Sequence, residues 1–489
     1  MTGILRFFIL FIVAMIWVSC EMNVDPGQAG PPIKKDSKQA HKVLNSVLEK
    51  KKLRAVTNYG SLSYFIYRGE PMGYQFELLK NLCANLNVEL ELVIERDLNK
   101  CIEMLNDRDV DLIAMGLTIT NSRKKNILFT DPIMITRQVL VQRKPKGWER
   151  MATADEIESH LLKSTFDLDG KKIYVEEGTV FKQQLEQLAN DVAENIQIVT
   201  DPREVEELIS AVADGEIDYT IADEHVALVN AKYYPNLDVS LAVSFPQKIG
   251  WAVKKNQTAL ADTIDSWLDK FNHELLSRLL INKYFKNIGS RRISKSQYNS
   301  YTGGHLSPYD SLIRQGAALL GWDWRFLASL IYQESEFKPE VKSWAGAFGL
   351  MQLMPSVLET YGIDSTASPA LQIDAGAKYL ASLQRQLPTS ITDSLQRVLF
   401  TVAAYNSGLG HVLDARRLAG KQGLNPDVWV DNTEICMLKL SDPDHYSDPI
   451  VYYGYSRGNE TYAFVREIYE RYSHYVNLIG NTQFKNQDR

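Results

Sequence analysis

A single carboxyl group at the end of an apolar helix face, directly ahead of a glycine-rich turn, constrains this chain more than any other feature. Apolar residues recur at helical spacing at Leu327, Leu330 and Ile331. Glu334 follows them by seven, four and three residues, so its carboxyl points to the same side. A carboxyl held against hydrophobic side chains has a raised pKa and can donate a proton near neutral pH. Taken alone, the pattern also fits a core helix with a hydrogen-bonded glutamate, and that alternative stays open.

The turn that follows this helix allows a close approach of the backbone to a ligand. Gly346 and Gly349 carry no side chain within the segment AGAFGLMQ. Gln352 adds an amide that both donates and accepts hydrogen bonds. Glu336 lies two positions after Glu334 and faces roughly the opposite side of a helix, so we expect it in solvent. The sequence therefore predicts an acid beside a ligand-binding turn.

A second apolar helix, predicted over residues 398–405, ends in AYNSG at residues 404–408, with Asn and Gly where helices commonly stop. Three ordered motifs, Glu334-Ser335, GLMQ at 349–352 and AYNSG, resemble those of the soluble-lytic-transglycosylase domain, a relative of goose-type lysozyme. The resemblance covers residues 306–475. It implies a mainly α-helical, lysozyme-like domain that cuts the glycan strands of peptidoglycan.

The same resemblance implies roles for individual residues and shows one departure. Glu334 would be the catalytic residue, and the substrate would contact Ser335, Gly349, Met351, Gln352, Tyr405 and Asn406. The family carries a Tyr in an E-T-x-x-Y-V run, where this chain has Phe464, so that hydroxyl is missing. Tyr462 is a candidate replacement. The segment YGYSRG at 453–458 resembles the one that precedes this run in the membrane-bound murein transglycosylase F group.

Length and charge indicate several domains and no nucleic-acid partner. A chain of 489 residues exceeds what one hydrophobic core usually covers, and its net charge of -6 argues against nucleic acid. Residues 290–305 are polar and read as a linker, and residues 476–489 as a tail.

The N-terminus has the features of an export signal. A short basic lead and the apolar run 7–18 precede Ser19-Cys20, and the run is too short for a comfortable transmembrane helix. Residues 1–19 resemble a bacterial lipoprotein signal, which implies that Cys20 is acylated and that the periplasmic protein is lipid-anchored, on the outer membrane. An ordinary secretory signal is the alternative. Residues 20–48 predict a flexible tether because they are polar and contain several Pro and Gly.

Residues 49–289 alternate β-rich runs with amphipathic helices, a pattern typical of α/β layers. Strands are expected over 53–57, 88–94, 112–115, 138–142, 172–175 and 219–222, and helices over 76–86 and 100–105. The segments that carry a resemblance to the family-3 extracellular solute-binding domain are GYQFE at 73–77, GLTITNSR at 116–123, FTDP at 129–132, EGT at 177–179 and GEID at 215–218. The resemblance implies a two-lobed, periplasmic-binding-protein-like domain for amino acids or similar small ligands.

That architecture implies a hinge and a ligand site. The chain would leave lobe one near residue 136 and return near residue 245. Arg123 presents a planar fork suited to a ligand α-carboxylate, and Asp223 would pair with an α-ammonium. Thr118 and Thr179 would add hydrogen bonds from opposite lobes. A solvated basic helix start at Arg123 and a surface cap at Asp223 are the plain alternatives.

The remaining cysteines suggest no metal chemistry. Cys83, Cys101 and Cys436 remain after Cys20, and an odd number cannot pair fully within the chain. Cys83 and Cys101 could form one disulfide, but their apolar surroundings favour buried free thiols. No Cys/His spacing indicates a metal site, and we predict no cofactor.

These parts together predict a lipid-anchored lytic transglycosylase with a regulatory domain that binds an amino acid or muropeptide. The resemblance implies that Glu334 protonates the oxygen between N-acetylmuramic acid and N-acetylglucosamine, then takes the C6 hydroxyl proton, which leaves a 1,6-anhydro end without water. A lysozyme-type muramidase is one rival, and it needs a second carboxylate such as Glu336, Glu340 or Glu359. The other rival is a periplasmic amino-acid or peptide sensor with a glycan-binding remnant.

Overall fold

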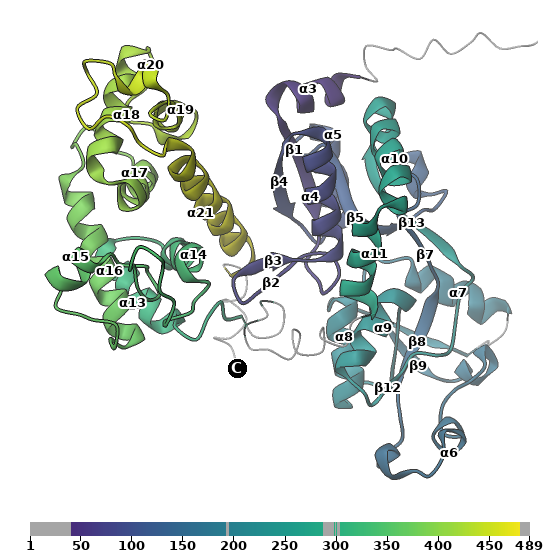
Figure 1. Cartoon of the computed structure of the whole chain (residues 1–489). Helices are drawn as coiled ribbons and strands as arrows, with labels where there is room; N and C mark the ends of the chain where they lie inside the picture. The colour runs from purple at the N-terminus through teal and green to yellow at the C-terminus, as the bar shows by residue number, and fades with distance from the viewer. Residues whose placement is uncertain (1–40, 192–194, 287–297, 299, 301–303, 480–489) are drawn as a thin grey trace, which may run out of the picture.

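The computed structural model describes residues 41–191, 195–286, 298, 300 and 304–479 (Figure 1). An α/β domain with two large sheets and a two-stranded hairpin comes first and a helical domain follows, which confirms the predicted fold class. The predicted signal and Cys20, most of the tether, most of the linker and the end of the tail lie outside the described residues. Within the described part of the chain, no helix is long and apolar enough to cross a membrane.

Lobe one of the α/β domain is built on a six-stranded sheet with the order β4-β1-β5-β13-β6, in which β7 also pairs with β13. Its strands are β1 (Lys52–Thr57), β4 (Glu89–Ile94), β5 (Leu112–Thr118), β6 (Ile127–Phe129), β7 (Met134–Thr136) and β13 (Gln247–Lys254). Its helices are α3 (Lys42–Lys50), α4 (Tyr74–Leu86), α5 (Leu98–Asp107), α10 (Thr258–His273) and α11 (Leu275–Ile281), with the short helices η1 (Arg123–Lys125) and η4 (Asn282–Lys286). β1 runs parallel to β4 and β5, whereas β13 is antiparallel to β5.

Lobe two has a five-stranded sheet with the order β10-β9-β11-β8-β12. Its strands are β8 (Gln138–Arg143), β9 (Lys172–Glu176), β10 (Gln197–Asp201), β11 (Tyr219–Asp223) and β12 (Leu237–Asp238). Its helices are α6 (Ala154–Glu158), α7 (Phe181–Asp191), α8 (Val205–Asp214) and α9 (Glu224–Tyr233), with η2 (Trp148–Arg150) and η3 (Thr165–Leu168). The chain crosses between the lobes at Arg137 and at residues 244–246, so two segments join the sheets.

The six strands expected from sequence are all present, but the tether is shorter than predicted. Residues 42–48, expected to be flexible, belong to helix α3, where Val43 and Val47 are buried. These two residues lie four apart, so one helix face packs onto lobe one. The predicted tail is corrected in the same way, because helix α21 continues through residues 476–479.

The thiols Cys83, Cys101 and Cys436 are free and buried, as their apolar surroundings predicted. Cys83 packs in the cluster around α4 and α10, and Cys101 packs in the cluster around α5. Burial raises the pKa of both of these thiols to about 12, so they are unreactive at neutral pH.

The second domain consists of helices (Figure 1), and they surround one large apolar cluster. Its elements are α13 (Asp310–Leu320), α14 (Trp324–Ser335), α15 (Pro355–Thr360), α16 (Pro369–Gln386), α17 (Ser394–Ser407), α18 (Leu409–Lys421), η5 (Trp429–Thr433), α19 (Glu434–Lys439), α20 (Pro443–Tyr446) and α21 (Gly458–Ile479). α14 lies against α13 and α21, and α21 also contacts α17 and α19. α14 therefore occupies a central position, and its apolar face is fully enclosed.

The apolar cluster of the helical domain continues into lobe one of the α/β domain. A hairpin of β2 (Phe65–Tyr67) and β3 (Glu70–Met72) supplies Ile66, while Tyr64 and Phe76 join from its flanks. The hydroxyl of Tyr475 on α21 donates to the carbonyl of Gly69 at the hairpin tip, at 2.7 Å. Figure 1 shows the hairpin reaching the end of α21. The two domains thus share a core at this point.

The tip of the hairpin has no room for a side chain. Gly69 has a φ of +85°, and a Cβ added there would lie 2.6 Å from the ring of Tyr332, 2.7 Å from the Tyr475 hydroxyl and 2.8 Å from Phe337. Close backbone approach and positive φ both require glycine here.

We predict that Gly69→Ala destabilises the protein more than a glycine substitution in open space. Gly170→Ala is the matched control, because Gly170 has a φ of +69° with nothing within 4 Å of the added Cβ. The control should cost about 1 kcal/mol from the left-handed backbone alone. Gly69→Ala should cost about 2–4 kcal/mol because the overlap adds to that cost. Urea unfolding followed by tryptophan fluorescence measures both, and equal losses would show that the hairpin tip is loosely packed.

Candidate active site

The carboxyl of Glu334 lies on the apolar face of α14, as the sequence predicts. The helix begins at Asp323, whose side chain accepts a hydrogen bond from the backbone N–H of Arg325. Leu327, Leu330 and Ile331 are fully buried. Glu334 itself is half-buried, and burial raises the pKa of its carboxyl to about 8. The group is therefore neutral at pH 7, which is the state of an acid ready to donate.

The turn after α14 is held by a side chain that the sequence analysis did not single out. Gln372 on α16 accepts a hydrogen bond from the N–H of Leu350 at 2.7 Å and donates to the carbonyl of Ala367 at 2.8 Å. A Cβ at Gly349, which has a φ of +80°, would lie 2.4 Å from the Gln372 Oε1. Gly349 is thus required by the packing of Gln372 beneath the turn.

Gln352 and Met351 fix the far end of this turn. The Gln352 Nε2 donates to the carbonyls of Val341 at 3.0 Å and of Gly349 at 2.9 Å. Both amide hydrogens are then used within the turn, which leaves the Oε1 to accept from a ligand. Met351 is fully buried, and its sulfur fills the space above Gly376. The structure thus gives Met351 a packing contact below the turn.

Ser335 and Tyr405 tie the turn to the acid. The Ser335 hydroxyl lies 2.8 Å from the carbonyl of Leu350, so α14 and the turn are joined one residue after Glu334. The Tyr405 hydroxyl on α17 donates to the carbonyl of Met351. Burial, and then the nearby Glu334, raise the pKa of Tyr405 well above its usual value. The structure therefore brings Glu334, the turn and Tyr405 together.

Asn406 has a partner that sequence reasoning missed. The Thr461 hydroxyl on α21 donates to the Asn406 Oδ1 at 2.7 Å, and Thr461 is almost fully buried. With its oxygen occupied, the exposed Asn406 presents its Nδ2 hydrogens to the outside. The two residues are 55 apart in the chain, so no local pattern indicated the contact.

Phe464 occupies the position at which the family carries a tyrosine. Phe464 packs against the core of the helical domain. The ring of Tyr462 instead lies 5.0 Å from the guanidinium of Arg466, on another face of α21, because residues two apart on a helix point about 200° apart. Tyr462 therefore does not stand in for the missing hydroxyl.

The three carboxylates considered for a hydrolase are all exposed to solvent. Glu336 ends α14 in a left-handed conformation, with a φ of 51°, and pairs with Lys338. Its exposure agrees with the prediction. Glu340 and Glu359 are also exposed. The environment that raises the pKa of Glu334 is thus not shared by these carboxylates.

In the α/β domain, the predicted ligand residues come from both lobes. Arg123 is half-buried and its Nη1 donates to the carbonyl of Thr118 at 3.1 Å. Asp223 stands at the N-terminal end of α9 but makes no side-chain cap, which contradicts the plain alternative of a surface cap. Burial raises the pKa of Asp223 to about 7, and the positive charge of Arg123 opposes that rise. The two charged groups are therefore neighbours.

One oxygen of this aspartate has no partner. The Asp223 Oδ1 is buried and forms no hydrogen bond with the described residues. Thr179 does not serve it, because its hydroxyl donates to the carbonyl of Glu176 at 2.8 Å. A buried acceptor without a donor is costly, so the site is suited to a ligand that supplies N–H groups.

A contact between the lobes was also missed. The Glu206 Oε1 on α8 accepts from the N–H of Ser61 at 2.9 Å and from its hydroxyl at 3.0 Å. Arg96 of lobe one pairs with Glu204 of lobe two. Burial raises the pKa of Glu204 and of Glu206 to about 7. The place of Glu206 on the apolar face of α8 could have indicated a buried carboxyl. No local pattern could have indicated its partner, which lies 145 residues away.

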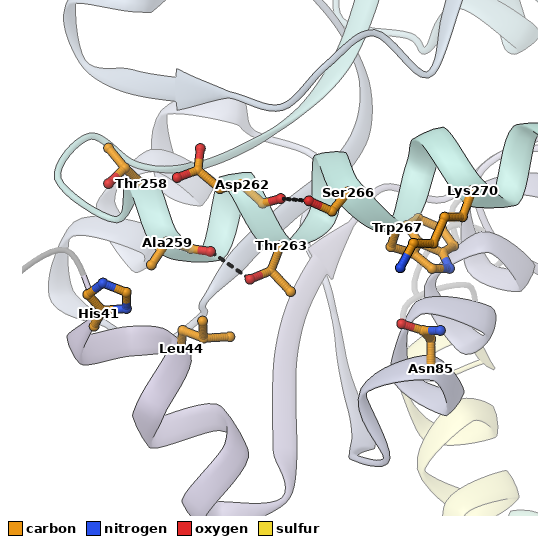
Figure 2. A pocket seen from close by; sticks show the side chains of 10 residues that line it. All are labelled: His41, Leu44, Asn85, Thr258, Ala259, Asp262, Thr263, Ser266, Trp267 and Lys270. Carbon is orange, nitrogen blue, oxygen red and sulfur yellow. Dashed lines mark hydrogen bonds between the residues drawn. The ribbon is translucent and has the colours of Figure 1, made fainter.

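A hollow between α3 and α10 offers no comparable chemistry (Figure 2). It has a volume of about 450 Å³ and is open to solvent. Two of its hydroxyls are used within α10, where Thr263 donates to the carbonyl of Ala259 and Ser266 donates to that of Asp262. We assign no site to this hollow.

Comparison with known proteins finds two family matches. Residues 53–287 match the bacterial extracellular solute-binding proteins of family 3, and residues 311–427 match the transglycosylase SLT domain.

Full-length relatives share both parts. The chain is 31% identical over 440 residues to membrane-bound lytic murein transglycosylase F of Desulfosudis oleivorans, an alignment that covers 89% of this chain and 92% of that protein. It is 32% identical over 433 residues to the protein of the same name from Pseudomonas fluorescens, covering 88% and 85%. Among solved structures, an ancestral arginine-binding protein bound to arginine matches with a TM-score of 0.41 at 24% identity, covering 48% of this chain and 98% of that one.

We predict that Glu334→Gln stabilises the protein at neutral pH. A carboxyl with a folded pKa of about 8 and an ordinary unfolded pKa supports folding fully at acid pH, and this support is lost as the pH rises from about 4.5 to about 8. Gln mimics the neutral carboxyl at every pH. The variant should therefore match the wild type at pH 4.5 and exceed it at pH 7.5 by about 2–4 kcal/mol, where the upper figure is about 1.36 kcal/mol for each of three pH units and partial solvent exposure lowers it.

Thermal unfolding across this pH range tests the burial of the carboxyl. Glu336→Gln is the matched control, since it removes an exposed carboxylate two residues away, and it should follow the wild type throughout. A Glu334→Gln curve that parallels the wild type at all pH values would show that the carboxyl titrates as an exposed group.

Proposed function

Because this chain belongs to the membrane-bound lytic murein transglycosylase F family, we propose that it cleaves the β-1,4 bond between N-acetylmuramic acid and N-acetylglucosamine without water. Its family makes it a peptidoglycan lytic transglycosylase. The observation that supports the non-hydrolytic mechanism is the half-buried carboxyl of Glu334, whose pKa is raised by burial to about 8, whereas the three other candidate carboxylates are exposed. A lysozyme-type muramidase, by contrast, needs a second carboxylate to activate the attacking water.

Glu334 first acts as an acid. Its proton goes to the glycosidic oxygen, the bond to the muramic acid C1 breaks, and the bonding electron pair leaves with the N-acetylglucosamine oxygen. C1 then has oxocarbenium character. Because the carboxyl is neutral before this step, its ionisation supplies a negative charge only when the positive charge develops.

The same residue, Glu334, then acts as a base. The carboxylate takes the proton of the C6 hydroxyl of muramic acid, and the C6 oxygen bonds to C1. The proton that Glu334 gave is thereby replaced, and a 1,6-anhydro end results with no water consumed. The exposed Nδ2 of Asn406 and the Oε1 of Gln352 are suited to hold acetamido groups, which offer one acceptor and one donor.

Glu334→Gln should lower kcat by about 100- to 10,000-fold, because it removes both proton transfers while keeping the shape of the site. Wild-type products from purified sacculi should be lighter than muramidase products by one water, as mass spectrometry would show. Reducing-end muramic acid as the main product would overturn the non-hydrolytic mechanism. Glu336→Gln should keep wild-type activity if Glu334 is the one carboxyl required.

The α/β domain is proposed to bind a small zwitterion such as an amino acid or cell-wall peptide. Support comes from Arg123 and Asp223, which are neighbours of opposite charge, and from the partnerless Oδ1 of Asp223. The guanidinium of Arg123 would bind the α-carboxylate of the ligand, and the carboxylate of Asp223 would bind its α-ammonium group. Thr118 holds Arg123 through its carbonyl, and Thr179 lies in the opposite lobe.

Ligand binding has a structural route to the catalytic helix. The β2–β3 hairpin belongs to lobe one, and its tip is packed by Tyr332 and Phe337, which flank Glu334 on either side in sequence. A ligand that favours one arrangement of the lobes would change the equilibrium by its difference in affinity, typically worth about 1–3 kcal/mol. We therefore include regulation of glycan cleavage in the proposal.

Amino acids and cell-wall peptides should change the rate of sacculus cleavage by about 5- to 150-fold, the usual range of such coupling. Arg123→Ala should abolish the response and leave basal cleavage intact. Lys124→Ala is the matched control, because it removes an exposed positive charge one residue away. Calorimetry beside a turbidity assay separates the outcomes, and binding with no change in rate would reduce the domain to a recruitment module.

The proposal also includes a lipid anchor at Cys20, supported by the short apolar core that ends at Ser19-Cys20 and by the membrane-bound relatives. Cys20→Ser should move the protein from the membrane to the soluble periplasmic fraction, because stable anchoring would come from the acyl chains attached to that residue. Fractionation after carbonate and high-salt washes measures this, and a variant that stays bound would place the anchor elsewhere. An outer-membrane position would appear as co-sedimentation with outer-membrane proteins.

A further inference from the structure

Three exposed tyrosines gather on one irregular segment of the helical domain, between α20 and α21. Tyr452, Tyr453 and Tyr455 are 73%, 62% and 57% exposed. Single exposed aromatic residues are ordinary on protein surfaces, but a contiguous group of them commonly marks a binding site. We call residues 452–455 the tyrosine loop.

The backbone of the tyrosine loop is fixed by a fully buried carboxylate. Asp414 on α18 is 0% exposed, and its Oδ1 accepts from the N–H of Tyr452 at 2.8 Å while its Oδ2 accepts from that of Tyr453 at 2.7 Å. Arg417 pairs with the same carboxylate and donates to the carbonyl of Ile450 at 2.8 Å. Burying a charge for this purpose is costly, so the loop is held in one conformation before any ligand arrives.

Each ring is supported by a neighbour and remains more than half exposed. The guanidinium of Arg417 lies 4.2 Å from the centre of the Tyr452 ring. The Tyr453 ring rests on Gly410, where an added Cβ would lie 2.6 Å from it. The Tyr455 ring meets Tyr446 edge-on, with centres 5.8 Å apart. Supported rings lose little conformational entropy when a ligand covers them.

The tyrosine loop lies near Asn406 of the candidate active site along the chain. Gly410, beneath Tyr453, follows Asn406 by four residues, so at most about 14 Å of extended chain separates them. On its other side, the loop leads into α21, whose Thr461 holds the Asn406 side chain. The rings are therefore within reach of a polymer that is bound at Asn406 and extends toward α18.

We propose that the tyrosine loop is a distal binding subsite for the glycan strand, on which sugar rings stack away from the bond that is cut. The proposal rests on the proposed function and extends it to a preference for long strands. Tyrosine suits this ligand because its ring face covers the apolar C–H face of a pyranose and its hydroxyl bonds to sugar hydroxyls. A glycan also fits the nearness of Asn406, because one strand is long enough to occupy both places.

The test measures binding in the full-length Glu334→Gln protein, so that strands are not cut. Two variants are added to this background. Tyr453→Leu keeps an apolar cover over Gly410 and removes the aromatic face, and the double change Tyr452→Ala with Tyr455→Ala removes the other two rings. Each should weaken binding of long uncrosslinked glycan strands by about tenfold, the value of one or two aromatic contacts. Binding of the shortest strand that spans the scissile bond should change less than twofold.

Two controls distinguish stacking from structural damage. Tyr453→Phe should bind as the parent does, because the ring face is kept. Phe166→Ala removes a ring that is 69% exposed in lobe two of the α/β domain and should leave binding unchanged. Unaltered melting temperatures would exclude unfolding of the loop variants, and the double variant remains informative if Tyr453→Leu fails to fold.

Unchanged affinity for long strands in both loop variants would overturn the proposal. Equal losses on long and short strands would also overturn it, because the rings would then belong to the cleavage site. A protein partner that competes with glycan for the loop in the absence of any length effect would assign the loop to protein binding instead. This test measures binding, whereas the proposed lytic activity is tested by digestion of sacculi with the wild-type protein. A failure of that activity would therefore be seen separately, as sacculi that the wild type leaves uncut.

Discussion

Helix α14 packs into the centre of the helical domain, and the chemistry of the candidate site depends on that packing. Its apolar face is closed by α13, α21 and the turn at Gly349, so the Glu334 carboxyl has too little water around it to ionise readily. The same packing fixes the direction of the carboxyl. One interaction, the burial of this helix face, therefore sets both the position and the protonation state of the acid.

The parts of the site that face the substrate are rigid because their backbone is held by buried amides and hydroxyls. Gln372 holds the N–H of Leu350, the Ser335 hydroxyl holds its carbonyl, and the Tyr405 hydroxyl holds the next carbonyl. Each of these groups would be a natural substrate contact if it were free. In this fold they position the turn, and under the proposed function the Oε1 of Gln352 and the Nδ2 of Asn406 are the groups suited to hold a sugar. Such preorganisation lets the site act without rearranging during the reaction.

The α/β domain is tied to this arrangement by the hairpin at Gly69 and also by ion pairs. Arg466 on α21 joins Glu434 of the helical domain and Glu89 of lobe one, both at 2.6 Å. Glu434 is fully buried whereas Glu89 is exposed, so the first pair is the stronger constraint. The contact between domains thus combines a shared apolar core with a charged rim. Within the α/β domain, the hydrogen bond between Ser61 and Glu206 joins the two lobes. A ligand that moves the lobes would therefore act on a domain that is itself connected to the helical domain.

The sequence by itself determined the features that depend on local pattern. Helical spacing placed Glu334 on an apolar face, and alternation of short apolar runs with helices predicted α/β layers, while the two lobes were implied by the resemblance to the family-3 solute-binding domain. Motif order identified the turn and the Asn406 segment. The error at α3 arose because Pro and Gly in residues 26–32 outweighed a short amphipathic pattern at Val43 and Val47. Only the tertiary structure decided the partners, because Thr461 with Asn406, Gln372 with Leu350 and Ser61 with Glu206 are pairs of residues far apart in the chain. A hydrogen bond depends on distance and direction in space, and a single sequence contains no record of either for residues that meet only after folding.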